Sequence, residues 1–139
     1  MHFSGLIGKI PLYIDVTNDK DEDYIDFYMS DGSLITMYHQ QDCCESVYIE
    51  DIVGDLDKLL LTPIVKADEK IESGEDNDYE SFTFTFYTLA SKNGYVDIRW
   101  HGESNGYYSE SVDISVTQYD PASLPNYKEL KTTHPEILI

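Results

Sequence analysis

Apolar and polar residues alternate with a period of two along most of this chain, and this pattern constrains the fold more than any other feature. On residues 95–101, Val96, Ile98 and Trp100 point one way and the intervening polar side chains point the other. Residues 82–86 alternate phenylalanine with threonine in the same manner. Such alternation is typical of half-buried strands in antiparallel sheets, so the sequence predicts a mainly β fold.

Short turn signals separate the alternating segments and indicate how the strands connect. Ser30-Asp31-Gly32 and Asn93-Gly94 supply residues that favour hairpin turns. We therefore expect about seven strands in a curled or two-layer antiparallel sheet. The expected strands lie near residues 6–16, 24–29, 34–39, 47–53, 82–86, 95–101 and 107–119, with residues 64–71 as an ambiguous edge strand.

One short helix is expected near residues 55–61, so the expected fold class is mainly β (α+β). Asp55 is a suitable N-cap, the leucines after it have helical spacing, and Pro63 ends the turn. Residues 1–119 are expected to form a single globular domain. The proline-containing segment 120–139 is expected to be an irregular tail.

The charge of the chain restricts its partners. Nine Lys and Arg against 27 Asp and Glu give a formal net charge of -18. This charge repels phosphates and anionic membrane surfaces, so we expect no direct nucleic-acid or membrane binding. It would attract a basic protein surface, although acidity also serves solubility alone. No segment approaches about 18 apolar residues, which predicts a soluble protein in the cytoplasm.

Both cysteines lie in "HQQDCCESV", a stretch with the composition of a metal site. His39, Cys43, Cys44 and Glu45 are candidate ligands for zinc or iron. However, adjacent cysteines on a strand point to opposite faces, and a vicinal disulfide is strained, so we expect reduced thiols. The alternative is a structural strand-end corner, in which polar side chains bond the backbone and one cysteine packs inward.

Enzyme chemistry is not predicted. Asp42 and Glu45 flank the cysteines, and negative neighbours raise a thiol pKa, which disfavours a nucleophile. No catalytic constellation and no phosphate-binding glycine-rich loop is present. Arg99 and Trp100, with nearby tyrosines, form either a binding surface or an ordinary core anchor and strand ion pair. In the first case they would also permit sequestration of a small signalling nucleotide.

Two segments together resemble a known family. "HQQDCCESVYIEDIVGDL" (39–56) and "RWHGESNGYYSESV" (99–112) are similar to motifs of small bacteriophage and prophage proteins that share a domain of unknown function. The resemblance covers roughly residues 23–116. It implies a phage setting and supplies no catalytic residue.

Charge and resemblance together favour a non-enzymatic inhibitor without a cofactor, acting in the cytoplasm of the infected or lysogenic bacterial host. It would occlude a basic, nucleic-acid-binding surface of a host or antiphage-defence protein such as a CRISPR effector, by DNA mimicry. No oligomeric state is assigned. The expected partner contacts are Asp19, Asp21, Glu22, Asp23, Glu72, Glu75, Asp76, Asp78, Glu80, Tyr107 and Tyr108. A metal-binding protein that uses the cysteine stretch is the alternative.

Overall fold

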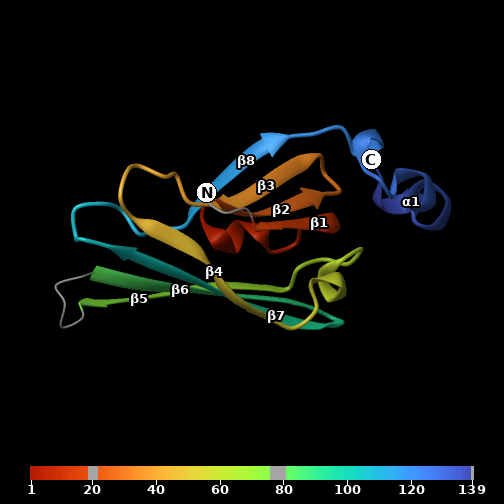
Figure 1. Ribbon diagram of the computed structural model, residues 1–139. Coiled ribbons are helices and arrows are strands. Elements are labelled where there is room, and N and C mark those ends of the chain that lie inside the picture. Colours follow the sequence, from red (N-terminus) through yellow and green to blue (C-terminus); the bar gives the residue numbers. More distant parts are fainter. Residues whose placement is uncertain (19–21, 76–80, 139) are drawn as a thin grey trace.

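A computed structural model confirms the mainly β class and shows two antiparallel sheets packed as layers (Figure 1). It describes residues 1–18, 22–75 and 81–138. Sheet A contains, in spatial order, β1 (Pro11–Asn18), β2 (Asp23–Met29), β3 (Ser33–Tyr38) and β8 (Asp113–Gln118). Sheet B contains, in spatial order, β4 (Ser46–Val53), β7 (Gly94–Ser104), β6 (Ser81–Ser91) and β5 (Lys66–Glu75).

Sheet A combines local hairpins with one long-range pairing. The predicted turn at Ser30-Asp31-Gly32 joins β2 to β3, and Gly32 has a φ of 86°, which favours glycine. Strand β8 comes from a distant part of the chain and pairs with β3, with Ser33 opposite Gln118. This last pairing brings the segment before β8 close to the segment after β3.

Sheet B has β7 and β6 at its centre. The predicted hairpin joins them, with Ser91 opposite Gly94. Strand β4 pairs with β7 through a register shift between Ile49 and Asp51. Strand β5 lies at the edge, as expected, but covers Lys66–Glu75 rather than 64–71.

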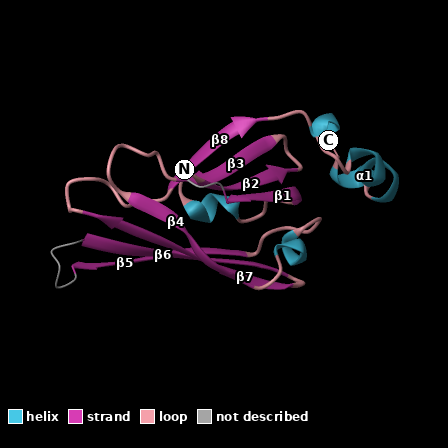
Figure 2. Cartoon of the chain, in the orientation of Figure 1, coloured by secondary structure: helices cyan, strands magenta, loops and turns pink. Residues whose placement is uncertain are grey.

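Figure 2 shows the two sheets as separate layers, and the side chains of the core come from both of them. Trp100 is 1% exposed and therefore anchors the core from β7. A short 3-10 helix, η1 (Phe3–Leu6), adds Phe3 and Leu6 to the same cluster. Burial of each large side chain of this kind stabilises the fold by about 1.5–3 kcal/mol. Other core residues are Ile25, Phe27, Met29, Ile35 and Met37 from sheet A, and Tyr87, Leu89, Val96 and Ile98 from sheet B.

The alternating segment 82–86 forms a strand, and its threonine face is the one that turns inward. Thr85 is buried, whereas Phe84 and Phe86 are half-buried on the outer face of sheet B. The ring of Phe84 packs 4.7 Å from that of His101 on the neighbouring strand. The outer aromatic residues thus cover each other and their strand neighbours instead of the core.

The helices differ from the sequence expectation. The expected helix at 55–61 is a shorter 3-10 helix, η2 (Leu56–Leu59), and the side chain of Asp55 caps it by accepting a hydrogen bond from the Asp57 N–H. Within the described residues, no helix is long and apolar enough to span a bilayer.

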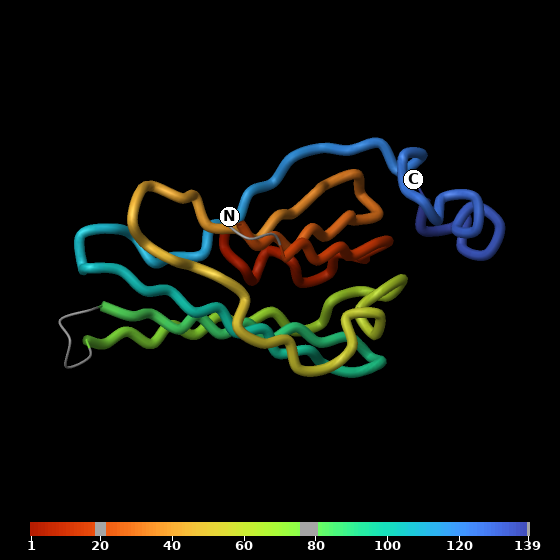
Figure 3. The backbone as a smooth tube through the Cα atoms, in the orientation of Figure 1, coloured from red at the N-terminus to blue at the C-terminus, as the bar shows by residue number. Residues whose placement is uncertain are grey.

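The C-terminal segment, expected to be irregular, is wrongly predicted in part. It contains η3 (Pro121–Ser123), the α-helix α1 (Tyr127–Thr133) and η4 (Pro135–Ile137). Figure 3 shows it beyond one end of sheet A. Leu124 and Leu130 pack with Leu12 in a second, smaller apolar cluster, and this packing orders the segment.

Candidate functional site

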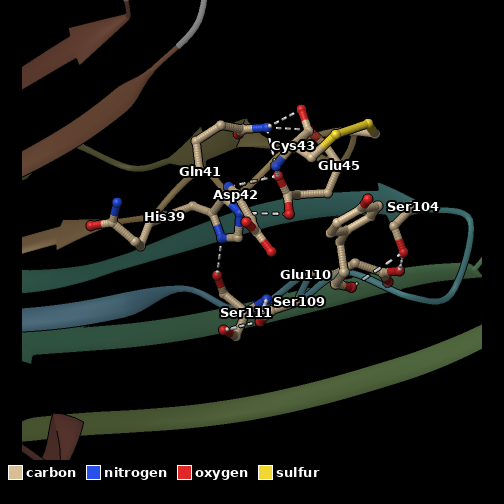
Figure 4. Close-up of polar contacts among 12 residues, drawn as sticks. His39, Gln41, Asp42, Cys43, Glu45, Ser104, Ser109, Glu110 and Ser111 are labelled. Atoms are coloured by element: carbon tan, nitrogen blue, oxygen red, sulfur yellow. Dashed lines mark hydrogen bonds and ion pairs between the residues drawn. A yellow bond between two sulfur atoms is a disulfide. The ribbon is translucent and has the colours of Figure 1, made fainter.

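The corner formed by residues 39–45 is organised around one buried carboxylate. Glu45 is 5% exposed, and its Oε1 accepts hydrogen bonds from Gln41 Nε2 at 2.6 Å and from the backbone N–H groups of Asp42 and Cys43 at 3.0 Å (Figure 4). Desolvation acts to raise the pKa of Glu45, but the backbone hydrogen bonds and His39 outweigh it and lower that pKa. The sequence therefore forms the strand-end corner that was expected as the alternative to a metal site.

The expectation of reduced thiols and of one inward cysteine is wrong. Cys43 and Cys44 form a disulfide, and both side chains are exposed. In an extended strand, the side chains of two adjacent cysteines would point to opposite faces. The chain bends at these two residues, so the alternation does not apply there.

The candidate metal ligands do not gather around a common point. His39 Nδ1 donates a hydrogen bond to the Ser111 carbonyl at 2.7 Å, and Nε2 lies 3.9 Å from Glu45 Oε2. The sulfurs of Cys43 and Cys44 are bonded to each other and are therefore not thiolates. Among residues 1–18, 22–75 and 81–138, no group of three or more His, Cys, Asp or Glu side chains is placed to hold an ion.

A second buried carboxylate organises the loop between β7 and β8. Glu110 is 8% exposed and accepts hydrogen bonds from Thr83 Oγ1 at 2.8 Å and from the Ser104 hydroxyl. A Cβ on Gly102 would come within 2.8 Å of Glu110 Cβ. Glycine at position 102 therefore lets the loop approach the sheet closely.

The corner and the loop contact each other, as Figure 4 shows. His39 bonds to the Ser111 carbonyl, and the Gln40 N–H donates to Asp113 Oδ2 at 2.9 Å. His39 Nε2 and Glu45 Oε2 are buried and have no hydrogen-bond partner in the part of the chain that the structure describes. The two segments that carry the family resemblance thus meet at one end of the sandwich.

The expected acidic contacts have different surroundings. Glu22 and Glu75 are exposed, while Glu72 is exposed and paired with Lys70 at 3.0 Å. Asp23 is half-buried, and its Oδ2 accepts a hydrogen bond from the Ile49 N–H at 2.7 Å, so this side chain links the two sheets. The expected contacts Asp19, Asp21, Asp76, Asp78 and Glu80 lie outside the described residues.

The aromatic candidates are also divided between environments. Tyr107 is 89% exposed at the loop end, whereas Tyr108 is half-buried. Arg99 pairs with Glu50 at 2.9 Å on the outer face of sheet B, and Trp100 points into the core. Arg99 and Trp100 consequently do not share a surface on which a nucleotide would bind.

The outer face of sheet A was not identified from the sequence as a site. Its exposed or half-buried side chains include Tyr24, Tyr28 and Tyr38, together with Asp15 and Asp26. None of the four strands of this sheet contains Lys or Arg. The alternation of Tyr24, Asp26 and Tyr28 along β2 was the sequence signal that placed aromatic and acidic groups on one face.

Comparisons with known proteins identify a family for this chain but no individual relative. No curated protein and no solved structure matches this chain. A family model matches residues 4–114, a span that contains most of the chain and both motifs described above. The protein therefore belongs to the family described as Domain of unknown function (DUF7448).

Proposed function

We propose that this protein is a non-enzymatic, phage-encoded binding module. It would occlude a basic nucleic-acid-binding surface of a host or antiphage-defence protein, such as a CRISPR effector. The observation that carries the proposal is the outer face of sheet A, which presents carboxylates and tyrosines on strands without Lys or Arg. The phage setting comes from the motif resemblance.

The distribution of charge supports a basic partner. Within the described residues, four basic side chains pair with acids: Lys9 with Asp31, Lys66 with Asp68, Lys70 with Glu72, and Arg99 with Glu50. These pairs neutralise much of the positive charge locally, and the remaining field is strongly negative. Such a field accelerates association with a basic surface and disfavours anionic ligands.

The tyrosines supply contact area beside the carboxylates. The ring of Tyr28 packs against Tyr13 and Tyr119, at centroid distances of 5.9 and 5.1 Å. Desolvation and the nearby carboxylates of Asp26 and Asp15 raise the pKa of Tyr28, so its hydroxyl is neutral at physiological pH. Tyrosine side chains whose rings are already packed against neighbours give a large contact area in protein interfaces, because little conformational entropy is lost on binding.

Salt dependence tests the proposal directly. A partner captured from host or defence-system lysate and identified by mass spectrometry is immobilised, and its affinity for the full chain is measured at 50 and 500 mM NaCl. We expect the affinity to fall by at least about tenfold, because salt screens exposed charges. Duplex DNA should compete with the protein for the same partner. Salt-insensitive binding, or no competition by DNA, would contradict occlusion of a nucleic-acid site.

Paired charge variants locate the interaction. Asp15→Asn with Asp26→Asn removes two charges from the outer face of sheet A and should weaken binding several-fold. Glu129→Gln with Glu136→Gln removes the same number of charges from the C-terminal segment, where both side chains are exposed. We expect this control to bind almost as the parent does. Equal weakening by the two pairs would show that net charge alone acts.

The segment 72–80 is tested separately, because the sequence also predicts contacts there. Neutralising Glu75, Asp76 and Asp78 should weaken binding if this segment touches the partner. Unchanged binding of this variant would restrict the interaction to other acidic residues.

A further inference from the structure

A pocket of about 250 Å³ lies at one end of the outer face of sheet A. Tyr24 and Tyr38 form part of its wall, with nearly parallel rings at an interplanar angle of 19° and a centroid distance of 6.3 Å. Gln40 and Gln41 of the corner complete another side. We call this site the tyrosine pocket. Its wall therefore includes the corner that the buried Glu45 holds in place.

Carboxylates flank the aromatic rings of the tyrosine pocket. Glu22 lines it and accepts a hydrogen bond from the Tyr24 hydroxyl at 2.5 Å. Asp26 lies next to it on β2 and accepts a hydrogen bond from Thr36, another lining residue, at 2.6 Å. The hydrogen bond to Glu22 and the negative charges nearby raise the pKa of the Tyr24 hydroxyl, so this hydroxyl stays protonated and the side chain stays neutral.

Aromatic rings beside carboxylates form an environment that attracts a cation. The negative face of a tyrosine ring binds Arg or Lys, and a carboxylate adds a charge-assisted hydrogen bond. Ligand pockets for drug-sized molecules begin at about 300 Å³, so the tyrosine pocket is of the size for a single side chain. Because sheet A carries no Lys or Arg in its strands, no basic residue of these strands competes for the site.

We propose that the tyrosine pocket binds an arginine side chain of the basic partner. This inference rests on the proposed function and specifies one contact of it. Arginine fits better than lysine because its planar guanidinium stacks on aromatic rings, bonds a carboxylate through two N–H groups, and is more weakly hydrated. The geometry of the corner then has a function, since it places Gln40 and Gln41 at the rim of the pocket.

The first experiment compares two peptides of equal charge. Acetylated and amidated tri-arginine and tri-lysine are titrated into the full chain at low salt, and backbone amide shifts are followed by NMR. We expect the largest arginine-induced shifts at Tyr24, Tyr38 and Gln40. Arginine should bind about two- to fivefold more tightly than lysine. Equal affinities, or shifts spread evenly over the acidic surface, would overturn the pocket.

Variants test whether the aromatic wall causes this preference. Tyr38→Ala should abolish the difference between the two peptides, whereas Tyr38→Phe should keep it. Tyr95→Ala is the matched control, because Tyr95 is 62% exposed on the other sheet. If Tyr38→Ala does not fold, Glu22→Gln provides a milder test and should reduce arginine affinity. An unchanged arginine preference in the folded variant would refute the assignment.

The outcomes distinguish this inference from the proposed function. If both peptides bind equally and diffusely, with strong salt dependence, only the tyrosine pocket is refuted. If neither peptide binds at low salt, both the pocket and the attraction to basic partners are refuted.

Discussion

Replacing Glu110 with alanine tests how the loop between β7 and β8 is held against sheet B. The buried carboxylate accepts hydrogen bonds from Thr83 and Ser104, and the Ser104 hydroxyl in turn accepts the Gly106 N–H at 3.0 Å. The substitution therefore removes the acceptor on which two hydroxyl groups converge. It also removes the acceptor that orients the Ser104 hydroxyl, to which the Gly106 N–H donates.

The expected loss of stability follows from these contacts. A hydrogen bond to a charged group contributes about 1.5–3 kcal/mol, so two of them give about 3–6 kcal/mol. Part of this is recovered, because Thr83 keeps a contact with Ser73 at 3.1 Å and Ser104 keeps one with the Tyr108 carbonyl at 3.4 Å. We therefore expect the free energy of unfolding to fall by about 3 kcal/mol.

Urea unfolding followed by circular dichroism measures this effect, with the midpoint shifting at constant slope. Glu110→Gln keeps the shape of the side chain and should cost about half as much, while Thr83→Ala, which removes one of the two bonds, should cost about 1 kcal/mol. A loss below about 1 kcal/mol for Glu110→Ala would show that the carboxylate does not hold the loop. Equal losses for alanine and glutamine would show that charge, and not the acceptor geometry, matters.

Three further predictions concern single groups. Tyr87 is 1% exposed, and its hydroxyl has no hydrogen-bond partner within the described residues. Tyr87→Phe should therefore leave the free energy of unfolding, measured in urea, unchanged or raise it by up to about 1 kcal/mol. Desolvation acts to raise the pKa of Asp31, but hydrogen bonds from Lys9 and Ser33 outweigh it and lower that pKa to about 2. The stability from Asp31 should therefore be present above about pH 4 and lost as the pH falls towards 2. Because its side chain is 46% exposed, Asp31→Asn should remove only about 1 kcal/mol, measured by unfolding between pH 2 and 6. Cys43→Ser with Cys44→Ser should change the free energy of unfolding by less than about 0.5 kcal/mol, because both side chains are exposed; a larger loss in urea would assign the pair a structural role.

The candidate site was only partly predictable from the sequence. The sequence identified the corner at residues 39–45 as a polar strand end, since glutamine and acidic side chains bond free backbone groups. It did not identify Glu45 as the buried acceptor, because the burial of a carboxylate depends on which distant segments cover it. The contact of His39 with Ser111 likewise arises only when β8 pairs with β3.

Local chemistry determined where the strands lie. Alternation along β2 and β7, together with the turns at Gly32 and Gly94, is encoded within a few residues, and the structure shows these elements where they were expected. The net charge of -18 also follows from the sequence alone. The expectation that this charge repels anionic partners therefore does not depend on the fold.

Tertiary structure decided which face of each strand is buried and which segments become neighbours. The alternation of Phe84 and Thr85 fits either orientation, and only the packing of sheet A against sheet B selects the threonine side as the inner one. The same holds for α1, whose few residues form a helix because Leu130 packs near Leu12. Such choices depend on contacts between residues far apart in the chain, so a local pattern cannot contain them.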